Sequence, residues 1–390
     1  MKVAVIIPLE EPFDSYHGGA VARWVYHVYK EIDNIEYDIF SSNSSSEYSY
    51  PLPSKVKPFF SNLNILSVNM CEFFSKNGRG KSFVKKVLTG NGKFWINSIS
   101  NEIARYDLVH IHNRPYYALW LRERGYSGKI ILHMHNSLKS YINESTKHDV
   151  FNAVDEIIFC SKYMQSEGLY HFDGMIKKSY VVYNGIEQFS SLNEKTNHSN
   201  RVKLVHSGRL VPEKGADKAI SIASKLLELG YNIELSIIGG VSFGNDGVTG
   251  YSKTIKKLAA EVNSKYSNNP IKILGYMHHT EMMTYFKNSD VFLYPVEWDE
   301  PFGMVIIEAM ANSMFVISRY KGGIPEIISN NEIGLLVKSD DDSELVQSCI
   351  DILSNKEKML NVSNNAMVYV KEKFHWKEIS SSLMNILIMK

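Results

Sequence analysis

The sequence has little net charge, few cysteines and no long apolar run, and each of these shortages excludes a class of protein. Its 390 residues contain 43 lysines and arginines against 42 aspartates and glutamates, a formal net charge of +1. A nucleic-acid-binding protein normally has a marked basic excess, so nucleic acid is not an expected partner. The three cysteines, Cys71, Cys160 and Cys349, have neither redox nor metal-ligand spacing. We therefore expect no disulfide framework and a cytoplasmic chain.

No stretch approaches the roughly 20 consecutive apolar residues that span a bilayer. The N-terminus reads M-K-V-A-V-I-I-P-L-E-E, and two acids follow its short apolar run at once. A secretory signal needs a longer apolar core. The segment therefore predicts a first buried strand, and any membrane contact of the chain is expected to be peripheral.

The length and the order of apolar segments predict two α/β domains. A chain of 390 residues exceeds what one hydrophobic core usually organises. Short β-branched runs alternate with helical patterns, and the same rhythm restarts in the second half, which is typical of parallel sheets covered by helices on both faces. The strands expected are 3–7, 108–112, 130–135 and 156–160, then 202–207, 233–239, 271–275, 291–295 and 315–318.

The fold class expected is two doubly wound, Rossmann-like domains that face each other across a cleft. We place the boundary near residue 185, because Asn184-Gly185 is a turn signal. The first domain is then 1–185 and the second 186–371. Ligands of such sheets bind at the carboxyl ends of the strands.

Two further segments carry structural expectations. The stretch 41–62 is rich in serine and proline and is expected to be an exposed loop. The C-terminal segment, about 372–390, contains a helix over 376–388 and can pack back on the first domain. The apolar face that predicts this helix holds Ile379, Leu383, Ile386 and Leu387.

The segment S-G-R-L-V-P-E-K-G, Ser207 to Gly215, follows a predicted strand and precedes an amphipathic helix. Gly208 and Gly215 let the backbone approach a ligand closely. Arg209 and Lys214 place two cations at the carboxyl end of the strand, beside a helix N-terminus. This pattern favours a diphosphate site, and the alternative is a solvated turn with surface charges.

The segment E-P-F-G-M-V-I-I-E, Glu300 to Glu308, runs from a loop into a helix. If the helix begins near Gly303, the amides of Gly303, Met304 and Val305 are unpaired and suit phosphate or sugar oxygens. The two glutamates can reach different parts of one extended ligand. The alternative is a helix-dipole acid followed by a satisfied core glutamate.

In combination these segments resemble a known family. G-R-L-x-x-E-K-G followed by E-P-F-G-M-V-I-I-E-A-M-A is similar to the retaining glycosyltransferases of family 4, which have the GT-B fold. Each motif alone is weak, but their order and spacing together are specific. The resemblance extends over nearly the whole chain through H-G-G-A at 17–20, I-I-L-H-M-H-N at 130–136, Y-N-G-I-E at 183–187, K-G-G-I-P-E-I-I at 321–328 and a closing F-H-W-K-E-I.

The resemblance implies a role for each residue of a donor site. Arg209 and Lys214 would bind the diphosphate of a nucleotide-sugar, Glu308 would hold the ribose, and Glu300 would contact the transferred sugar. From the N-terminal domain, the glycine loop would line the donor phosphates. The remaining donor-binding residues implied are Gly18, Gly19, Gly208, Phe302, Gly303, Met304 and Val305.

One histidine is also implied as catalytic. His135 matches the histidine that the family has near the sugar and the reacting bond. His133 stands two residues earlier and shares its strand face, so either could face the core. The histidine directly before Asn136 fits the family pattern better. His110 and His112, which alternate along another strand, are expected to pack in the core or on the acceptor side.

We expect neither an essential metal nor a cofactor. His278-His279 lies in a predicted loop without a third ligand. The acidic run 340–342 is better explained as a helix N-cap in a solvated turn than as a metal site. Arg209, Lys214 and the helix N-terminus already supply positive potential toward a leaving diphosphate.

The expected reaction is the retaining transfer of a sugar from a nucleotide-diphosphate sugar to a glycan or lipid-linked glycan. UDP is the commonest donor nucleotide among bacterial members of the family, whose products include cell-surface polysaccharide and lipopolysaccharide. One alternative is another GT-B enzyme, such as a nucleotide-sugar epimerase. The other is a catalytically silent GT-B subunit that binds glycan or a partner enzyme, which the intact Arg209, Lys214, Glu300 and Glu308 disfavour.

The segment 75–95 predicts contact with an anionic membrane. Six basic residues and no acid lie between Lys76 and Lys93, and apolar residues, among them Phe94 and Trp95, interleave with them. Such a surface can insert apolar groups among headgroups while its lysines meet anionic lipid. We therefore expect peripheral attachment to the inner face of the cytoplasmic membrane. The alternative is a solvated helix whose apolar side packs on the first sheet.

Overall fold

The computed structural model describes residues 1–15, 19–42, 49–56, 81–187, 189, 201–240 and 247–389, without the side chains of 81–91. These residues form two compact units, Met1–Val182 with Ser380–Lys390, and Tyr183–Ile379. The first division falls between Val182 and Tyr183, whereas the sequence suggested residue 185. Each unit has the doubly wound α/β architecture expected from the sequence.

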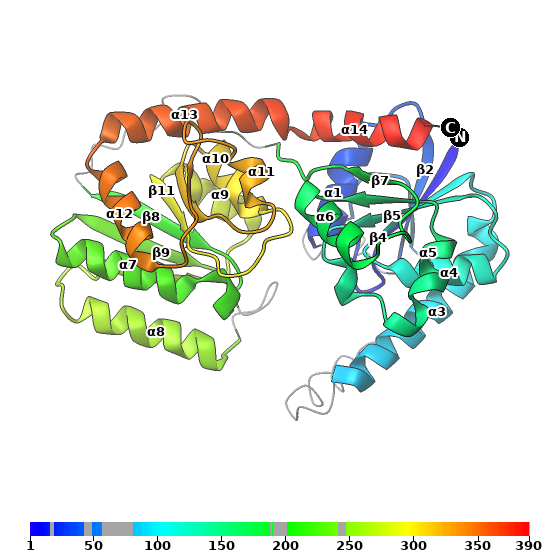
Figure 1. The fold of residues 1–390 in the computed structure, drawn as a ribbon, viewed down its shortest axis with the longest axis horizontal. Coiled ribbons are helices and arrows are strands. Elements are labelled where there is room, and N and C mark those ends of the chain that lie inside the picture. The colour runs from blue at the N-terminus through cyan, green and yellow to red at the C-terminus, as the bar shows by residue number, and fades with distance from the viewer. Residues whose placement is uncertain are drawn as a thin grey trace. The chain divides into compact units, whose positions relative to one another are not determined.

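The first unit is built on a seven-stranded parallel sheet with the order β3-β2-β1-β4-β5-β6-β7 (Figure 1). Its central strands are buried along their length, as parallel strands covered on both faces must be. The strands are β1 Lys2–Ile6, β2 Glu36–Ser41, β3 Ser54–Val56, β4 Leu108–His112, β5 Lys129–Met134, β6 Glu156–Phe159 and β7 Ser179–Val181.

Except between β2 and β3, helices in the described residues connect successive strands, so each of these crossovers returns the chain to the same end of the sheet. The sheet order places the carboxyl ends of β4 and β5 side by side, with His112 in register with His133. The helices are α1 Ala20–Tyr29, α3 Lys81–Ile103, α4 Pro115–Glu123, α5 Lys147–Ala153 and α6 Lys162–His171, with short 3-10 turns η1 Leu138–Ser140 and η2 Glu144–Thr146.

The expectation of an exposed loop over 41–62 is wrong in part. Residues 54–56 form β3, which pairs in parallel with the end of β2, Ile39 opposite Ser54. Serine and proline flank this strand, and its three residues are too few to show a period in the sequence. Residues 43–48 and 57–62 lie outside the described part of the chain.

The second unit has a six-stranded parallel sheet with the order β10-β9-β8-β11-β12-β13. The order changes direction on either side of β8, so the loops after β8 and β11 leave the sheet next to each other, at the place where such folds bind ligands. The strands are β8 Val202–Ser207, β9 Ile233–Ile238, β10 Ile271–Gly275, β11 Val291–Tyr294, β12 Phe315–Arg319 and β13 Leu335–Val337.

Helices cover both faces of this sheet (Figure 1). Val291 and Leu293 of β11 belong to the core cluster that includes residues of α7, α8 and α12. Phe292, between them, contacts Phe286 of α9 on the other face, with ring centroids 5.5 Å apart. The helices are η3 Pro212–Lys214, α7 Ala216–Glu228, α8 Gly250–Asn263, α9 His279–Lys287, α10 Met304–Ala311, α11 Ile324–Ile327, α12 Asp342–Leu353 and α13 Lys356–Lys373.

The C-terminal helix begins and ends where its apolar spacing predicts. It is α14, Trp376–Ile388. Ser380 donates a hydrogen bond of 2.9 Å from Oγ to the carbonyl oxygen of Val28 in α1, within the first unit. The four apolar residues that predicted the helix, Ile379, Leu383, Ile386 and Leu387, are all buried.

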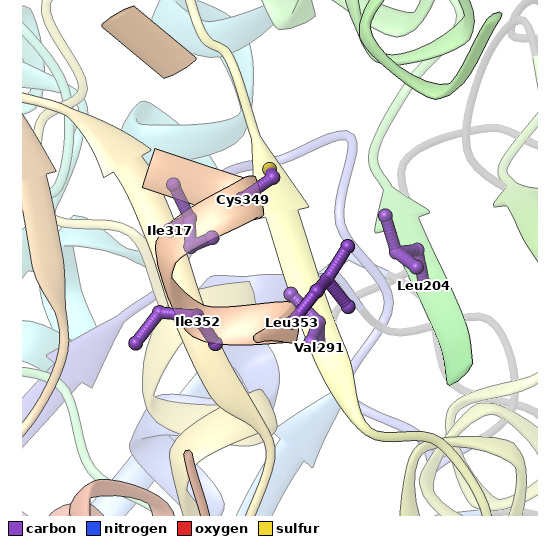
Figure 2. Close-up of a pocket in the computed structure, with 6 residues that line it drawn as sticks. All are labelled: Leu204, Val291, Ile317, Cys349, Ile352 and Leu353. Carbon is purple, nitrogen blue, oxygen red and sulfur yellow. The ribbon is translucent and has the colours of Figure 1, made fainter. Parts of the chain in front are cut away.

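A small gap in the hydrophobic core of the second unit is lined only by apolar atoms and one thiol. Figure 2 shows its six side chains, which come from β8, β11, β12 and α12: Leu204, Val291, Ile317, Cys349, Ile352 and Leu353. Burial raises the pKa of the Cys349 thiol to about 12, so this thiol stays protonated and is a poor nucleophile. The gap is therefore part of the core packing, and the polar chemistry of this unit lies at the strand ends.

Candidate functional site

The loop after β8 is held against the end of β11 by a glycine. Gly215 has φ +75° and caps the N-terminus of α7. A Cβ atom at this position would lie 2.2 Å from the carbonyl oxygen of Pro295, so a larger residue would push the two loops apart. The amide of Glu297 also donates a 3.0 Å hydrogen bond to the carbonyl oxygen of Glu213. The two expected ligand-binding loops therefore form one surface.

Lys214 and Glu300, which the sequence assigns to different parts of a ligand, contact each other. Their side chains form an ion pair, and both are largely buried, with 13% and 8% of the side-chain surface exposed. The Lys214 ammonium also lies 4.8 Å from the ring centroid of Trp298. The pairing compensates the cost of burying a carboxylate, which is severe for an unpaired charge.

Tyr294 is a second partner of Glu300. Its hydroxyl donates a hydrogen bond to the same carboxylate oxygen that Lys214 contacts. Burial, and then the charge of Glu300, raises the pKa of the Tyr294 hydroxyl well above its usual value, so it remains a donor at neutral pH. The Glu300 carboxylate is thus fixed by an ammonium and a phenol before any ligand arrives.

The backbone around Glu300 rests on the glycine pair of K-G-G-I-P-E. The amide of Gly323 donates a 2.7 Å hydrogen bond to the carbonyl oxygen of Glu300, and the amide of Gly322 donates one of 3.0 Å to the side chain of Asp299. Gly322 has φ +55°, and a Cβ there would lie 2.2 Å from the carbonyl oxygen of Glu300. The segment therefore holds the backbone of Glu300 in place, a role that we did not predict from the sequence.

Helix α10 begins as expected, directly after Gly303, whose φ of +111° favours glycine. Among the described residues, the amides of Met304 and Val305 have no hydrogen-bond acceptor, while the amide of Ile306 bonds to the carbonyl oxygen of Gly303. The first turn thus offers unpaired donors for an anion or a hydroxyl. The Phe302 side chain is buried between Tyr183 and Phe374, so only its backbone is available to a ligand.

Glu308 is buried on α10 and has a histidine partner. Its Oε1 lies 2.9 Å from His279 Nε2, and only 5% of its side-chain surface is exposed. The prediction that His278-His279 lies in a loop is wrong, because His278 caps α9 and His279 is its first residue. The alternative of a satisfied core glutamate is therefore partly right: one oxygen of Glu308 is engaged within the protein.

Arg209 lies at the exposed side of the same strand end. Within the described part of the chain its guanidinium makes no hydrogen bond or ion pair, although its charge opposes the rise of the Tyr294 pKa. A guanidinium without a partner in the protein is suited to binding an anion. Gly208, its neighbour, is approached closely by Gly239, where a Cβ would lie 1.8 Å from the Gly208 carbonyl oxygen.

In the first unit, the carboxylate of Glu11 lies at the N-terminus of α1, next to Gly19. Glu11 Oε1 accepts a 2.7 Å hydrogen bond from the amide of Ala22, in the first turn of α1. Burial raises the pKa of Glu11, and the amides of Ala22, Val21 and Gly19 oppose that rise. A Cβ at Gly19 would lie 2.7 Å from Glu11 Oε1. The helix end that the family resemblance gives to donor phosphates thus binds Glu11, and Gly18 lies outside the described residues.

His135 stands at the end of β5 beside three other histidines. Its Nε2 lies 3.0 Å from His112 Nδ1, and its ring stacks on that of His133 with centroids 4.2 Å apart, so the two share a face as predicted. His135 is partly exposed, whereas His133 is fully buried. Of the two alternatives, only His135 is accessible to a ligand. His110 and His112 are core residues, as expected.

The acidic run after β13 pairs with cations. Asp341 is the N-cap of α12 and accepts from the amide of Ser343 at 2.9 Å, as predicted for an N-cap. Asp342 forms an ion pair with Arg319, and Asp340 lies 2.9 Å from Lys321 Nζ. These carboxylates are engaged in structural contacts.

The basic segment is described only in part. Residues 75–80 and the side chains of 81–91 lie outside what the structure describes. Trp95 is 1% exposed and packs near Tyr117, so the expectation that its ring could enter a membrane is wrong. Phe94 is 69% exposed, and Lys93 pairs with Glu123 at 2.7 Å. None of the helices in the described residues is long and apolar enough to cross a bilayer.

Comparison with known proteins identifies the fold. Anabaena HepE in complex with UDP has a similar structure, with a TM-score of 0.73 and 17% identity over 99% of both chains. The fold of this chain is GT-B. Residues 188–368 match the family model described as "Glycosyl transferases group 1".

Relatives in sequence point the same way. Spore coat protein SA of Bacillus subtilis is 23% identical over 73% of this chain and 78% of its own length. The lipopolysaccharide 1,2-N-acetylglucosaminetransferase of Salmonella typhimurium is 23% identical over 70% of each chain. Together the comparisons support a glycosyltransferase activity.

Sequence reasoning missed four residues of the second unit that contact or support the site: Tyr294, Trp298, His279 and Gly322. Tyr294 ends a buried strand, and from the sequence alone such a residue is interpreted as part of the core. Trp298 has a buried indole Nε1 without a partner among the described residues. Only the three-dimensional structure shows this feature. The K-G-G sequence was a usable signal, because paired glycines indicate close approach of two backbones.

Replacing Gly322 by alanine tests the support of the Glu300 loop. The new Cβ would meet the Glu300 backbone at 2.2 Å in a left-handed conformation, so we expect a loss of about 2–3 kcal/mol in unfolding free energy and a displaced Glu300. Gly250→Ala is the matched control, because its Cβ would meet open space. Equal stability of the two variants in thermal unfolding would show that the glycine contact is dispensable.

His206 makes stability depend on pH. This buried histidine of β8 has Nδ1 3.2 Å from the carbonyl oxygen of Leu293, and burial lowers its pKa to about 4. Between the unfolded pKa of about 6.5 and the folded value, only the unfolded chain binds the proton. The contribution is therefore present above pH 6.5 and lost as the pH falls, by about 2 kcal/mol at pH 5.

His206→Asn should remove this dependence, because asparagine does not titrate and can still donate to the Leu293 carbonyl. Urea unfolding at pH 7.5 and pH 5.0 measures the effect. The wild-type protein should lose about 2 kcal/mol more than the variant between these two pH values. Parallel losses in both proteins would mean that folding does not lower the pKa of His206.

Proposed function

We propose that the chain is a retaining glycosyltransferase of family 4 that transfers a sugar from a nucleotide-diphosphate sugar, with a UDP-sugar as the expected donor. The acceptor is a glycan or lipid-linked glycan of bacterial cell-surface polysaccharide or lipopolysaccharide synthesis. The observation that carries the proposal is the convergence, in the second unit, of a free guanidinium, unpaired helix amides and a fixed carboxylate. HepE, whose structure contains UDP, supports the choice of nucleotide.

The diphosphate is assigned to Arg209 and to the first turn of α10. Arg209 is exposed and unpaired within the described part of the chain, while Lys214 is already engaged with Glu300. When a diphosphate binds, Lys214 can share its ammonium between Glu300 and a phosphate oxygen, since an ammonium has three donors. These positive groups stabilise the charge that develops as the diphosphate leaves.

The two glutamates are assigned to two different sugars. Glu300 has one oxygen held by Lys214 and Tyr294, which orients the other toward a hydroxyl of the transferred sugar. Glu308, anchored by His279, is assigned to the ribose. Buried carboxylates of fixed orientation discriminate strongly among hydroxyl patterns, because a ligand lacking the hydroxyl leaves them unpaired.

The proposed chemistry proceeds on one face of the sugar. The bond from the anomeric carbon to the diphosphate oxygen breaks, the bond to the acceptor oxygen forms on the same face, and the acceptor proton passes to the leaving diphosphate. No metal enters this scheme, because the cationic groups and α10 take over its electrostatic task. His135 is assigned as a further catalytic residue of the first unit.

We propose cytoplasmic localisation with peripheral attachment to the inner face of the membrane through residues 75–95. The exposed Phe94 supports this assignment. Lys93 shares its charge with Glu123, so the remaining basic residues of the segment would provide most of the attraction to anionic lipid.

Incubation with a panel of nucleotide-sugars and glycan acceptors tests the reaction. We expect one donor to be consumed with release of its nucleoside diphosphate, a product whose anomeric configuration by NMR equals that of the donor, and an unchanged rate in EDTA. An inverted product would refute the mechanism. An epimerised sugar without transfer would identify the other GT-B activity, and nucleotide binding without turnover across the panel would favour a silent subunit.

The roles of the two glutamates are separable by calorimetry with the nucleoside diphosphate alone. Glu308→Gln should weaken its binding by about tenfold or more, because the ribose contact is charge-assisted. Glu300→Gln should leave that affinity nearly intact and reduce sugar transfer by orders of magnitude, because its target is the transferred sugar. Equal losses of nucleotide affinity in the two folded variants would show that the roles are divided wrongly.

A further inference from the structure

The first unit contains a cluster of four histidines that the proposed transfer reaction does not explain. His110 and His112 lie on β4, and His133 and His135 on β5 and directly after it. Residues two apart on a strand share a face, which brings the four rings together. His110, His112 and His133 are fully buried. Trp24 covers the cluster, with ring centroids 4.6 Å from His133 and 5.4 Å from His112.

Two ring nitrogens in this cluster lack a partner. Among the described residues, the Nε2 atoms of His112 and His133 are buried and make no hydrogen bond. Their Nδ1 atoms do bond, at 3.0 Å to His135 and at 3.3 Å to His110. Leaving a buried polar atom unpaired costs about 1–3 kcal/mol. Two such atoms in one cluster need a physical reason.

The spacing of the rings suits a shared ion. One ring nitrogen from each of His110, His112 and His133 lies within 4.8 Å of the others. An ion with bonds of about 2 Å holds tetrahedral nitrogen ligands about 3.3 Å apart, with ring centroids about 5 Å apart. The centroids of His112 and His110 lie 5.1 Å and 5.4 Å from that of His133. Those of His110 and His112 lie 4.3 Å apart, so these two rings would have to move apart. Ring rotations that shift each nitrogen by roughly an ångström would complete the geometry.

Hydrogen bonds can hold two of the three rings in the form that a metal ion requires. All three rings are fully buried, which disfavours their charged form. A neutral imidazole that donates from Nδ1 presents a lone pair on Nε2. His112 can donate to His135 in this way, and His110 can donate to the Tyr29 hydroxyl, 2.7 Å from its Nδ1. The lone pair of His110 Nε2 becomes available to an ion when the His133 ring turns and gives up its 3.3 Å hydrogen bond to that atom. Histidines that bind metals typically donate their second nitrogen to a neighbouring acceptor.

We propose that His110, His112 and His133 bind one transition-metal ion of the kind that accepts neutral imidazole ligands. Zn²⁺ and Cu⁺ both fit this chemistry. The cluster contains no carboxylate or thiolate to offset the charge, and burying a single charge costs less than burying two, so Cu⁺ should bind more tightly than Zn²⁺. The ion would join β4 to β5 and, through His112, fix the orientation of His135. The proposal does not depend on sugar transfer.

Metal content of the full-length protein provides the test. The protein is freed of metal with a chelator, and Zn²⁺ or, under anaerobic reducing conditions, Cu⁺ is then added to the folded protein and also during refolding from urea. The second route is needed because the three rings are buried. Elemental analysis after dialysis should find one ion per chain, and the melting temperature should rise with metal concentration.

Matched variants locate the ion. His133→Gln should weaken binding by about 100-fold or more. His148→Gln and His171→Gln, at exposed histidines, should bind as the wild type does. His279→Gln excludes the pair with Glu308 as the site. Failure of the wild-type chain to bind either ion by either route would overturn the proposal, as would undiminished binding in folded His133→Gln.

X-ray absorption spectroscopy of the loaded wild-type protein keeps the test decisive if His133→Gln does not fold. A shell of three imidazole nitrogens at about 2.0 Å is the expected result. Coordination dominated by sulfur or carboxylate oxygen would place the ion elsewhere and refute the site.

Discussion

The polar residues at the strand ends of the second unit are arranged around the buried carboxylate of Glu300. A charge that is only 8% exposed requires compensation, and it receives it from Lys214 on the loop after β8 and from Tyr294 at the end of β11. These partners can meet only because Gly215 lets the two loops touch and Gly322 lets the Glu300 backbone settle on a third loop. The charge of Glu300 thus joins two of the loops, and the amides of Gly322 and Gly323 attach the third to Asp299 and to the Glu300 carbonyl.

The regular elements follow from local sequence wherever burial is uniform. Strands β1, β4, β9 and β11 are largely buried and mostly apolar, and α14 has a continuous apolar stripe. Both signals are strong. The short strands β2, β3, β7 and β13 were not predicted. They have three to six residues, and those at the sheet edges owe their conformation to pairing with a neighbour, which is information that a local window does not contain.

The candidate site was predictable in composition and unpredictable in its contacts. Arg209, Lys214, Glu300 and Glu308 stand out because G-R-L-x-x-E-K-G and E-P-F-G-M-V-I-I-E occur in the order and spacing of a known family. That Lys214 would pair with Glu300, across 86 residues of sequence, depends on the order of β8 and β11 in the sheet. His279 and Tyr294 were missed for the same reason: each becomes informative only through the carboxylate beside it.

The two units use the ends of parallel strands in opposite ways. In the second unit, charges of both signs meet and leave a guanidinium and helix amides free, so the strand ends are prepared for an anionic ligand. In the first unit, the ends of β4 and β5 carry three fully buried imidazoles beside Trp24, and two of their ring nitrogens have no partner among the described residues. Solvent can screen and rearrange around the first arrangement, but it cannot reach the second. Anything that pairs with the buried imidazoles must therefore be enclosed as the chain folds.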